Sequence, residues 1–266
     1  MPPPAPDRHL LRRSFEEVPE LYDRARPGYP PQLFDDLVEL AGLRPGDRVL
    51  EIGCGTGQAT QPLAERGLRL TCIELGAGMV AFVRRRLARF PEVEIVQGLF
   101  ETWVPERAEF DAIVAFTSFH WLDPDAQYEK SARLLRPAGA LALGRSDTVL
   151  LDDHDPFWVD VREDYDAVVP SHEYQPPPRP DELGDYREQI DGSGRFRTID
   201  VSRYLWELTY SAEEFVALLE TYSGHRSIEE PQRSELYRRI RRRIDVAPGG
   251  RVRRTYVSTL HVARRS

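Results

Sequence analysis

Short apolar runs alternate with helix-like patterns through the middle of the chain and predict a parallel β-sheet. Between residues 47 and 145, the apolar runs have the length of buried strands, and the segments between them place apolar residues on one helical face. The predicted strands are 48–52, 69–74, 93–96, 110–116 and 140–144, and the predicted helices are 58–66, 77–90 and 124–135. Because this alternation requires crossovers of one hand, we predict a doubly wound, Rossmann-like α/β sheet with helices on both faces.

The flanking segments are expected to complete this sheet and to cover its ligand edge. Residues 30–41 predict a helix before the first strand. Two alternating segments, 197–210 and 251–263, enclose helical patterns at 212–222 and 228–244, and we expect them to add antiparallel strands, giving a mostly parallel seven-stranded sheet. Residues 152–195, rich in aromatic residues and proline, predict an inserted helical cap over the substrate, with helices near 157–168 and 181–190. The whole chain, 1–266, is therefore interpreted as one domain, with residues 1–10 as a disordered tail.

Composition narrows the class of protein. The net charge of −8 argues against a nucleic-acid partner, because proteins that bind a phosphate backbone usually gather positive charge. No apolar run reaches the length of a membrane-spanning helix, so no membrane partner is expected. Cys54 and Cys72 lie in or beside predicted strands, which favours two buried free thiols and a cytoplasmic location. The histidines and cysteines lack metal-ligand spacing, and no metal site is predicted.

A glycine-rich turn follows the first predicted strand. Glu51-Ile52-Gly53-Cys54-Gly55-Thr56-Gly57 places three glycines at alternate positions just before a predicted helix. Glycines there allow a sharp turn and close approach of a ligand to the backbone, and the following helix presents free N–H groups. The dinucleotide fingerprint requires glycine where Gln58 stands, and a phosphate loop requires a lysine that is absent, so both of these sites are disfavoured.

The turn resembles motif I of the class I S-adenosylmethionine (SAM)-dependent methyltransferases, acidic-x-G-x-G-x-G. Glu51, Gly53, Gly55 and Gly57 match that motif position for position. The segments 22–30 (YDRARPGYP) and 118–122 (SFHWL) are most similar to the small-molecule methyltransferases related to trans-aconitate methyltransferase. The resemblance covers roughly residues 22–144 and implies SAM as the cofactor.

The resemblance also implies roles for residues beyond the turn. Glu74 ends the second predicted strand, where a carboxylate can accept hydrogen bonds from the ribose hydroxyls. Leu99 stands where related enzymes often have an aspartate for the adenine amino group, so backbone groups near Leu99 and Phe100 are expected to recognise adenine instead; the alternative for Phe100 is a residue of the core. Main-chain carbonyls near Phe116 and Thr117 are expected to hold the methionine ammonium group.

Three further side chains are candidates for the reaction. His120 follows the fourth strand at the ligand edge and is the candidate general base, since a neutral imidazole is available near pH 7. The other reading of His120 is a residue that positions a loop or the substrate. Arg26 is predicted to pair with the methionine carboxylate or a substrate anion, and Tyr22 to cover the cofactor; packing of their segment on the sheet is the alternative.

These observations together predict transfer of a methyl group from SAM to a small molecule. The acceptor atom is expected to be oxygen, in a carboxylate or hydroxyl, on the strength of the resemblance. Two alternatives stay open, an NAD-dependent oxidoreductase and a SAM-binding protein without catalysis. The arginine-rich segment 237–244 carries apolar residues every fourth position and predicts an amphipathic helix with a solvated face, and the oligomeric state is not predicted.

Overall fold

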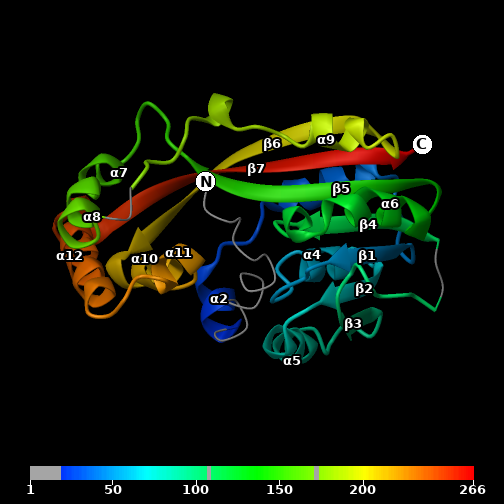
Figure 1. The fold of residues 1–266 in the computed structure, drawn as a ribbon, viewed down its shortest axis with the longest axis horizontal. Coiled ribbons are helices and arrows are strands. Elements are labelled where there is room, and N and C mark those ends of the chain that lie inside the picture. Colours follow the sequence, from blue (N-terminus) through cyan, green and yellow to red (C-terminus); the bar gives the residue numbers. More distant parts are fainter. Residues whose placement is uncertain (1–18, 107–108, 171–173) are drawn as a thin grey trace, which may run out of the picture.

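The computed structural model describes residues 19–106, 109–170 and 174–266. Its centre is a seven-stranded sheet with the order β3-β2-β1-β4-β5-β7-β6, in which β7 runs antiparallel to its neighbours β5 and β6 (Figure 1). The strands are β1 (Arg48–Ile52), β2 (Arg69–Glu74), β3 (Val93–Gln97), β4 (Phe110–Phe116), β5 (Leu135–Val149), β6 (Phe196–Ser211) and β7 (Arg251–Arg265). The predicted doubly wound, mostly parallel sheet is confirmed. The predicted tail, residues 1–10, lies outside the described residues.

Helices cover both faces of the sheet. They are α2 (Pro19–Ala25), α3 (Pro31–Leu40), α4 (Thr60–Glu65), α5 (Ala77–Arg86), α6 (Pro124–Leu134), α7 (Phe157–Asp160), α8 (Arg162–Val168), α9 (Arg187–Gly192), α10 (Ala212–Leu219), α11 (Ser223–Arg226) and α12 (Gln232–Val246), with 3₁₀ turns η1 (Phe119–Trp121), η2 (Pro180–Glu182) and η3 (Pro248–Gly250). Val49 of β1 belongs to the core under α3, α4 and α5, whereas Leu50 belongs to the core under α6 and α9. Successive residues of a strand point to opposite faces, which is why a strand buried on both sides is apolar throughout.

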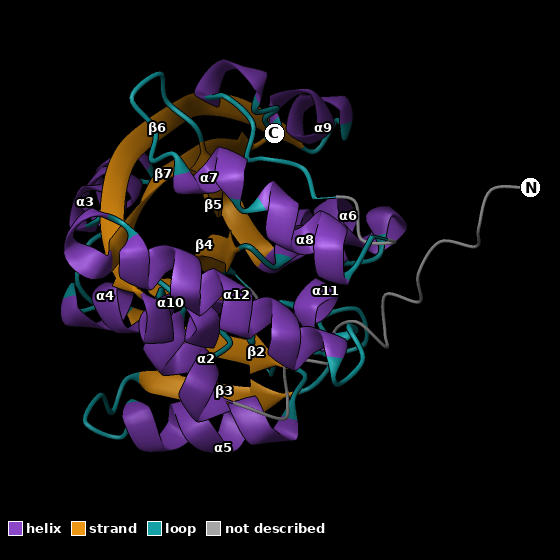
Figure 2. Ribbon diagram, turned by 90° about the vertical axis from the view of Figure 1, so that its left-hand side faces the viewer, coloured by secondary structure: helices purple, strands orange, loops and turns teal. Residues whose placement is uncertain are grey.

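Three long strands carry a second group of helices away from the parallel sheet. β5, β6 and β7 have 15, 16 and 15 residues, whereas β1 has 5. Beyond the parallel sheet, residues of these strands pack with α7, α8, α10 and α12 in a separate apolar cluster, the helical cluster, which includes Phe215 and Tyr256 (Figure 1). Seen from the side, these helices stand in front of the sheet together with α2 (Figure 2). The cover over the ligand edge therefore combines helices that precede β6 in the sequence, α7 and α8, with helices that follow it, α10 and α12.

The predicted cap segment divides into two parts. The expected helix at 157–168 is present as α7 and α8, which join the helical cluster. The expected helix at 181–190 is a 3₁₀ turn followed by α9, whose Ile190 packs in the core of the sheet beside Phe196. Only the first part thus lies with the helices over the ligand edge, and a substrate-covering role for residues 152–195 stays a prediction.

The arginine-rich segment forms the amphipathic helix α12. Leu236, Ile240 and Ile244 are fully buried, as the spacing predicts. Arg238 and Arg239 pair with Glu235 at 2.7 and 2.8 Å on the outer face. Two of the arginines in this segment are therefore paired with an acid of the same helix.

Candidate functional site

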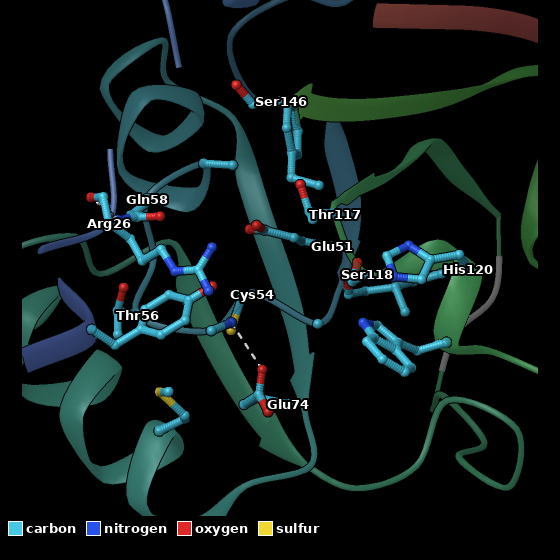
Figure 3. A pocket seen from close by; sticks show the side chains of 18 of the residues that line it. Arg26, Glu51, Cys54, Thr56, Gln58, Glu74, Thr117, Ser118, His120 and Ser146 are labelled. Carbon is cyan, nitrogen blue, oxygen red and sulfur yellow. Dashed lines mark hydrogen bonds between the residues drawn. The ribbon is translucent and has the colours of Figure 1, made fainter. Parts of the chain in front are cut away.

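A cavity of about 490 Å³ opens at the carboxyl ends of the parallel strands. Its walls come from the residues that follow β1, β2, β3 and β4, from the extension of β5, and from α2 and β7. The strand order changes direction between β1 and β4, the place where open α/β sheets bind their ligands. Figure 3 shows Arg26 and His120 on opposite sides of this cavity, with Glu74 at its base.

The glycine turn supplies the floor of the cavity. Gly53 has φ +70°, and a Cβ there would lie 2.7 Å from Ser118 Cβ, so only glycine fits beside the loop after β4. The Ser118 hydroxyl donates to the Ile52 carbonyl at 2.5 Å and holds that loop against the turn. At Gly55, with φ +54°, a Cβ would meet nothing within 4 Å, because this part of the backbone faces the open cavity. Gly57 packs against Val83 of α5.

Glu74 is tied to the same turn. Its Oε2 accepts a hydrogen bond from the Gly55 amide at 2.8 Å, and its Oε1 accepts one from Gly76 at 3.0 Å (Figure 3). These bonds orient the carboxylate at the end of β2, and a carboxylate is able to accept several hydrogen bonds at once. The structure therefore brings the predicted glycine turn and the predicted acid into direct contact.

Glu51 is a buried acid beneath the floor. It is 1% exposed, and the Cys72 thiol donates to its Oε2 at 3.6 Å. Burial raises the pKa of Glu51 from 4.5 to about 7, because removal from water disfavours the charged form. Glu51 therefore changes its charge near neutral pH. Cys54 and Cys72 are buried free thiols, as predicted.

The loop after β3 forms one end of the cavity. Leu99 and Phe100 both line it, and Phe100 is 2% exposed with its ring in the core under α6. Glu101 also lines the cavity, and its Oε1 accepts from the Asp123 amide at 3.2 Å. Sequence reasoning looked for an acid at position 99 and missed the one at 101, two residues further along the same loop.

The end of β4 holds a strained residue. Thr117 has φ 54°, a conformation that is unfavourable for a β-branched side chain. Its amide donates to the Gly144 carbonyl at 2.8 Å, and its hydroxyl shares a hydrogen bond with Tyr29 Oη at 2.9 Å. Phe116, Thr117 and Tyr29 all line the cavity, so the predicted strand end is part of the site.

The N-terminal segment closes one side. Tyr22 and Arg26 line the cavity, and the Gln58 side chain donates to the Arg26 carbonyl at 2.8 Å. Arg26 also donates from Nε to the Thr221 hydroxyl at 2.7 Å and from Nη2 to the Thr221 carbonyl at 3.1 Å. Its guanidinium thus joins the N-terminal segment to the helical cluster, and contact with a ligand carboxylate stays a prediction.

His120 lies on η1, on the side opposite Arg26, and is exposed to the cavity (Figure 3). Its ring contacts that of Trp121, with the two centroids 4.8 Å apart. An exposed imidazole at this edge is accessible to an acceptor molecule. The geometry is compatible with the predicted base role, which stays a prediction.

Sequence reasoning missed the upper wall of the cavity. Ser146, Asp147 and Thr148 on the extension of β5 line it, together with Tyr222, Arg254 and Tyr256 from far along the chain. Residues 145–148 are polar and gave no strand signal, although they pair with β7 in the structure. Four polar residues in a row show no alternation, so hydrophobicity gave no sign that this strand continues past residue 144.

Metal ligands and membrane-spanning helices are both absent from residues 19–106, 109–170 and 174–266. No group of three histidine, cysteine or acidic side chains in these ranges is arranged to hold a metal ion. None of the helices described there has the length and apolar character needed to cross a membrane.

Comparison with known proteins agrees with this geometry. Residues 49–139 match the family model described as methyltransferase domain. An uncharacterised methyltransferase of Mycobacterium tuberculosis is 35% identical over 136 residues, covering 51% of this chain and 53% of the relative. Trans-aconitate 2-methyltransferase of Paracidovorax citrulli is 31% identical over 141 residues, covering 52% and 49%. The chain thus spans about half the length of the curated relatives it matches.

Solved structures share the fold. The SAM-dependent methyltransferase from Thiobacillus denitrificans, in complex with S-adenosyl-L-homocysteine, has a TM-score of 0.52 at 14% identity, covering 94% of this chain and 97% of that one. The [4+2]-cyclase SpnF has a TM-score of 0.58 at 16% identity, covering 99% and 97%. The matched domain, the strand order and motif I support a class I SAM-dependent methyltransferase domain in this chain.

Proposed function

We propose that this protein transfers a methyl group from SAM to an oxygen atom of a small molecule. The observation that carries the proposal is the contact between the glycine turn and Glu74 at the floor of the cavity. Open backbone at Gly55 and an oriented carboxylate beside it suit a ligand with a ribose and a charged tail. The acidic groups of Glu51, Glu74 and Glu101 suit a cofactor that carries positive charge on sulfur and on its amino group.

Each part of the cofactor has candidate partners in the cavity. Glu74 would accept from the ribose hydroxyls. Leu99 and Phe100 would contact the adenine ring, and Glu101 is placed on the same loop to accept from its amino group. The methionine end would lie between the carbonyls near Phe116 and Thr117 and the side chains Tyr22 and Arg26.

When bound, SAM supplies a methyl group activated by a sulfonium. The residues of this chain have to align the acceptor oxygen with that group and to keep water out. The helical cluster, joined to the N-terminal segment through Arg26 and Thr221, provides the cover. For a hydroxyl acceptor, His120 would take up the proton as the new oxygen–carbon bond forms, and a carboxylate acceptor would need no base.

The relatives support a small-molecule acceptor, since trans-aconitate 2-methyltransferase is among them. A cytoplasmic location and the absence of a nucleic-acid partner stay predictions, supported by the two free thiols and the net charge of −8. A neighbour that shares the fold is named as a cyclase, so the fold alone does not establish methyl transfer, and the alternative of a SAM-binding protein without catalysis stays open. The NAD alternative is disfavoured because Gln58 occupies the third glycine position and holds the Arg26 segment.

Calorimetry and a labelling assay test this proposal. We expect SAM and S-adenosylhomocysteine to bind with micromolar affinity and NAD to show no binding. Incubation with methyl-labelled SAM and a pool of small metabolites should then yield a labelled product. Binding of NAD in preference to SAM would refute the proposal and support the alternative of an NAD-dependent oxidoreductase. Tight binding of SAM with no labelled product across broad pools would favour the non-catalytic alternative.

A further inference from the structure

Arg254 lies where two cavities meet. It is 8% exposed and lines both the cofactor cavity and a second cavity of about 350 Å³. Tyr222 is the other residue shared by the two linings. A molecule that reaches from the cofactor toward the second cavity would therefore pass these two side chains.

No carboxylate of the described residues forms an ion pair with Arg254. Its Nε and Nη2 donate to the Thr148 hydroxyl at 2.9 and 2.6 Å, and its Nη1 is buried without a hydrogen-bond partner. Elsewhere within residues 19–106, 109–170 and 174–266, buried or half-buried arginines do pair with acids, as Arg243 does with Asp164 at 2.6 Å. A buried cation without an anion is costly, and the cost falls when an anion binds beside it.

Aromatic rings surround the guanidinium. The ring centroids of Trp158, Tyr222 and Tyr256 lie 5.4, 5.7 and 5.3 Å from its central carbon. Cation–π attraction offsets part of the cost of burial and keeps the planar group in one orientation. Thr148 occupies the Nε–Nη2 edge, so the remaining N–H groups of Nη1 and Nη2 form the edge at which a guanidinium binds a carboxylate by two hydrogen bonds.

The second cavity is lined mainly by aromatic side chains. Phe157, Trp158, Tyr165, Tyr174 and Phe215 contribute rings to its walls, and His225 adds a polar group. Phe215 packs edge-on against Phe157 and Trp158, with centroid distances of 5.2 and 5.7 Å. Such walls favour a flat, apolar body with few polar groups.

Charge is distributed unevenly over the combined space. Three acids, Glu51, Glu74 and Glu101, lie at the cofactor end. Asp147 on the upper wall is paired with Arg145 at 2.5 Å and is therefore balanced within the protein. Arg26 also lines the cofactor end, and the proposed function assigns it to the methionine carboxylate. Arg254 is then left as the unbalanced charge beside the aromatic cavity, and a single cation is neutralised by one monoanion.

We propose that the methyl acceptor is a carboxylic acid with an aromatic or similarly flat apolar body. Arg254 binds its carboxylate, and the aromatic cavity holds its body. A carboxylate fits better than a phosphate monoester, because a dianion would leave a buried excess of negative charge. This inference rests on the proposed methyl transfer and names the class of acceptor for the same site.

Binding measurements with matched pairs of compounds test the acceptor class. The probes are benzoic, cinnamic, 4-hydroxyphenylpropanoic and indole-3-acetic acids, each with its primary amide, titrated by calorimetry into protein saturated with S-adenosylhomocysteine. We expect at least one acid to bind, and to bind at least about 30-fold more tightly than its amide, since an amide leaves the guanidinium unneutralised. If no acid binds more tightly than its amide, the proposal is overturned.

Variants separate a binding role from a structural one. Arg254→Met should reduce the affinity for the acid at least about 30-fold and leave that for the amide unchanged, and Arg254→Lys should lie between. The control is Arg253→Met on the same strand, whose guanidinium pairs with Asp153 outside the cavity. Equal losses for acid and amide would assign Arg254 a packing role and overturn the proposal. SAM affinity, measured in every variant, distinguishes this failure from failure of the proposed function, which would appear as no SAM binding in the unmodified protein.

Discussion

Replacing Glu74 with alanine is expected to weaken the binding of SAM while leaving the sheet intact. The two oxygens of this carboxylate accept hydrogen bonds from the backbone of Gly55 at 2.8 Å and Gly76 at 3.0 Å. A carboxylate offers about four acceptor sites in all, so the same group is able to accept the two ribose hydroxyls when the cofactor binds. The variant would lose both ligand bonds and the bond that holds the glycine turn.

The magnitude follows from these contacts. A hydrogen bond to a charged group contributes about 1.5–3 kcal/mol. The two ribose bonds share one half-buried carboxylate, so their contributions overlap, and we expect a net loss of about 1–3 kcal/mol, or roughly 5- to 150-fold in Kd. Glu74→Gln keeps one carbonyl oxygen as an acceptor and loses the charge, so its affinity should lie between those of Glu74→Ala and the unmodified protein.

Calorimetry with SAM and urea unfolding of the same samples separate binding from folding. Glu92→Ala is a matched control, because that carboxylate is exposed and pairs with Arg69 at 2.9 Å outside the cavity. We expect the control to bind SAM with unchanged affinity. A Glu74→Ala protein that unfolds at the same urea concentration as the original and binds SAM equally well would refute the ribose assignment.

Three further predictions concern the turn, the buried acid and the candidate base. Gly53→Ala should lower the free energy of unfolding by about 2–4 kcal/mol, because the new methyl would lie 2.7 Å from Ser118 Cβ at a φ of +70°; a loss below about 0.5 kcal/mol in urea unfolding would contradict the close approach. The folded protein raises the pKa of Glu51 to about 7, so it binds this proton more tightly than the unfolded chain. Stability from this group is complete below pH 4.5 and falls by about 3 kcal/mol as the pH rises through 7. In the Glu51→Gln variant, the free energy of unfolding should fall less steeply as the pH rises through 7. If the variant and the unmodified protein show the same dependence of stability on pH, Glu51 does not contribute to it. His120→Gln should reduce kcat toward a hydroxyl acceptor about 10²- to 10⁴-fold with SAM affinity unchanged, and full turnover would exclude a base.

The parallel half of the fold was predictable because it is buried on both faces. β1, β2 and β4 have the bounds that the apolar runs predicted, and the helices between them differ only at their ends. α4 begins at Thr60 rather than at residue 58, because the turn continues through Gln58. The position of Gly53, Gly55 and Glu74 at one edge of the sheet was also predictable, because each follows or ends a parallel strand and parallel strands end at the same edge.

The extension of β5 was not predictable from hydrophobicity. Residues 145–148 are polar, and their pairing with β7 and their position on the cavity wall depend on a strand more than a hundred residues away. Glu101 was missed for a related reason, because a loop places side chains without a period that a pattern could show.

Consecutive residues are enough to predict the doubly wound sheet and the floor of the cofactor site, because an apolar strand followed by a glycine turn is a local pattern. What faces that floor depends on contacts between residues far apart in the chain. Thr148, Tyr222 and Arg254 meet because the β5–β7 pairing continues to Val149 and Thr255, and because the helices between β6 and β7 fold back over the cavity. The buried charge of Arg254 became visible only when the three-dimensional packing showed that no carboxylate of the described residues neutralises it.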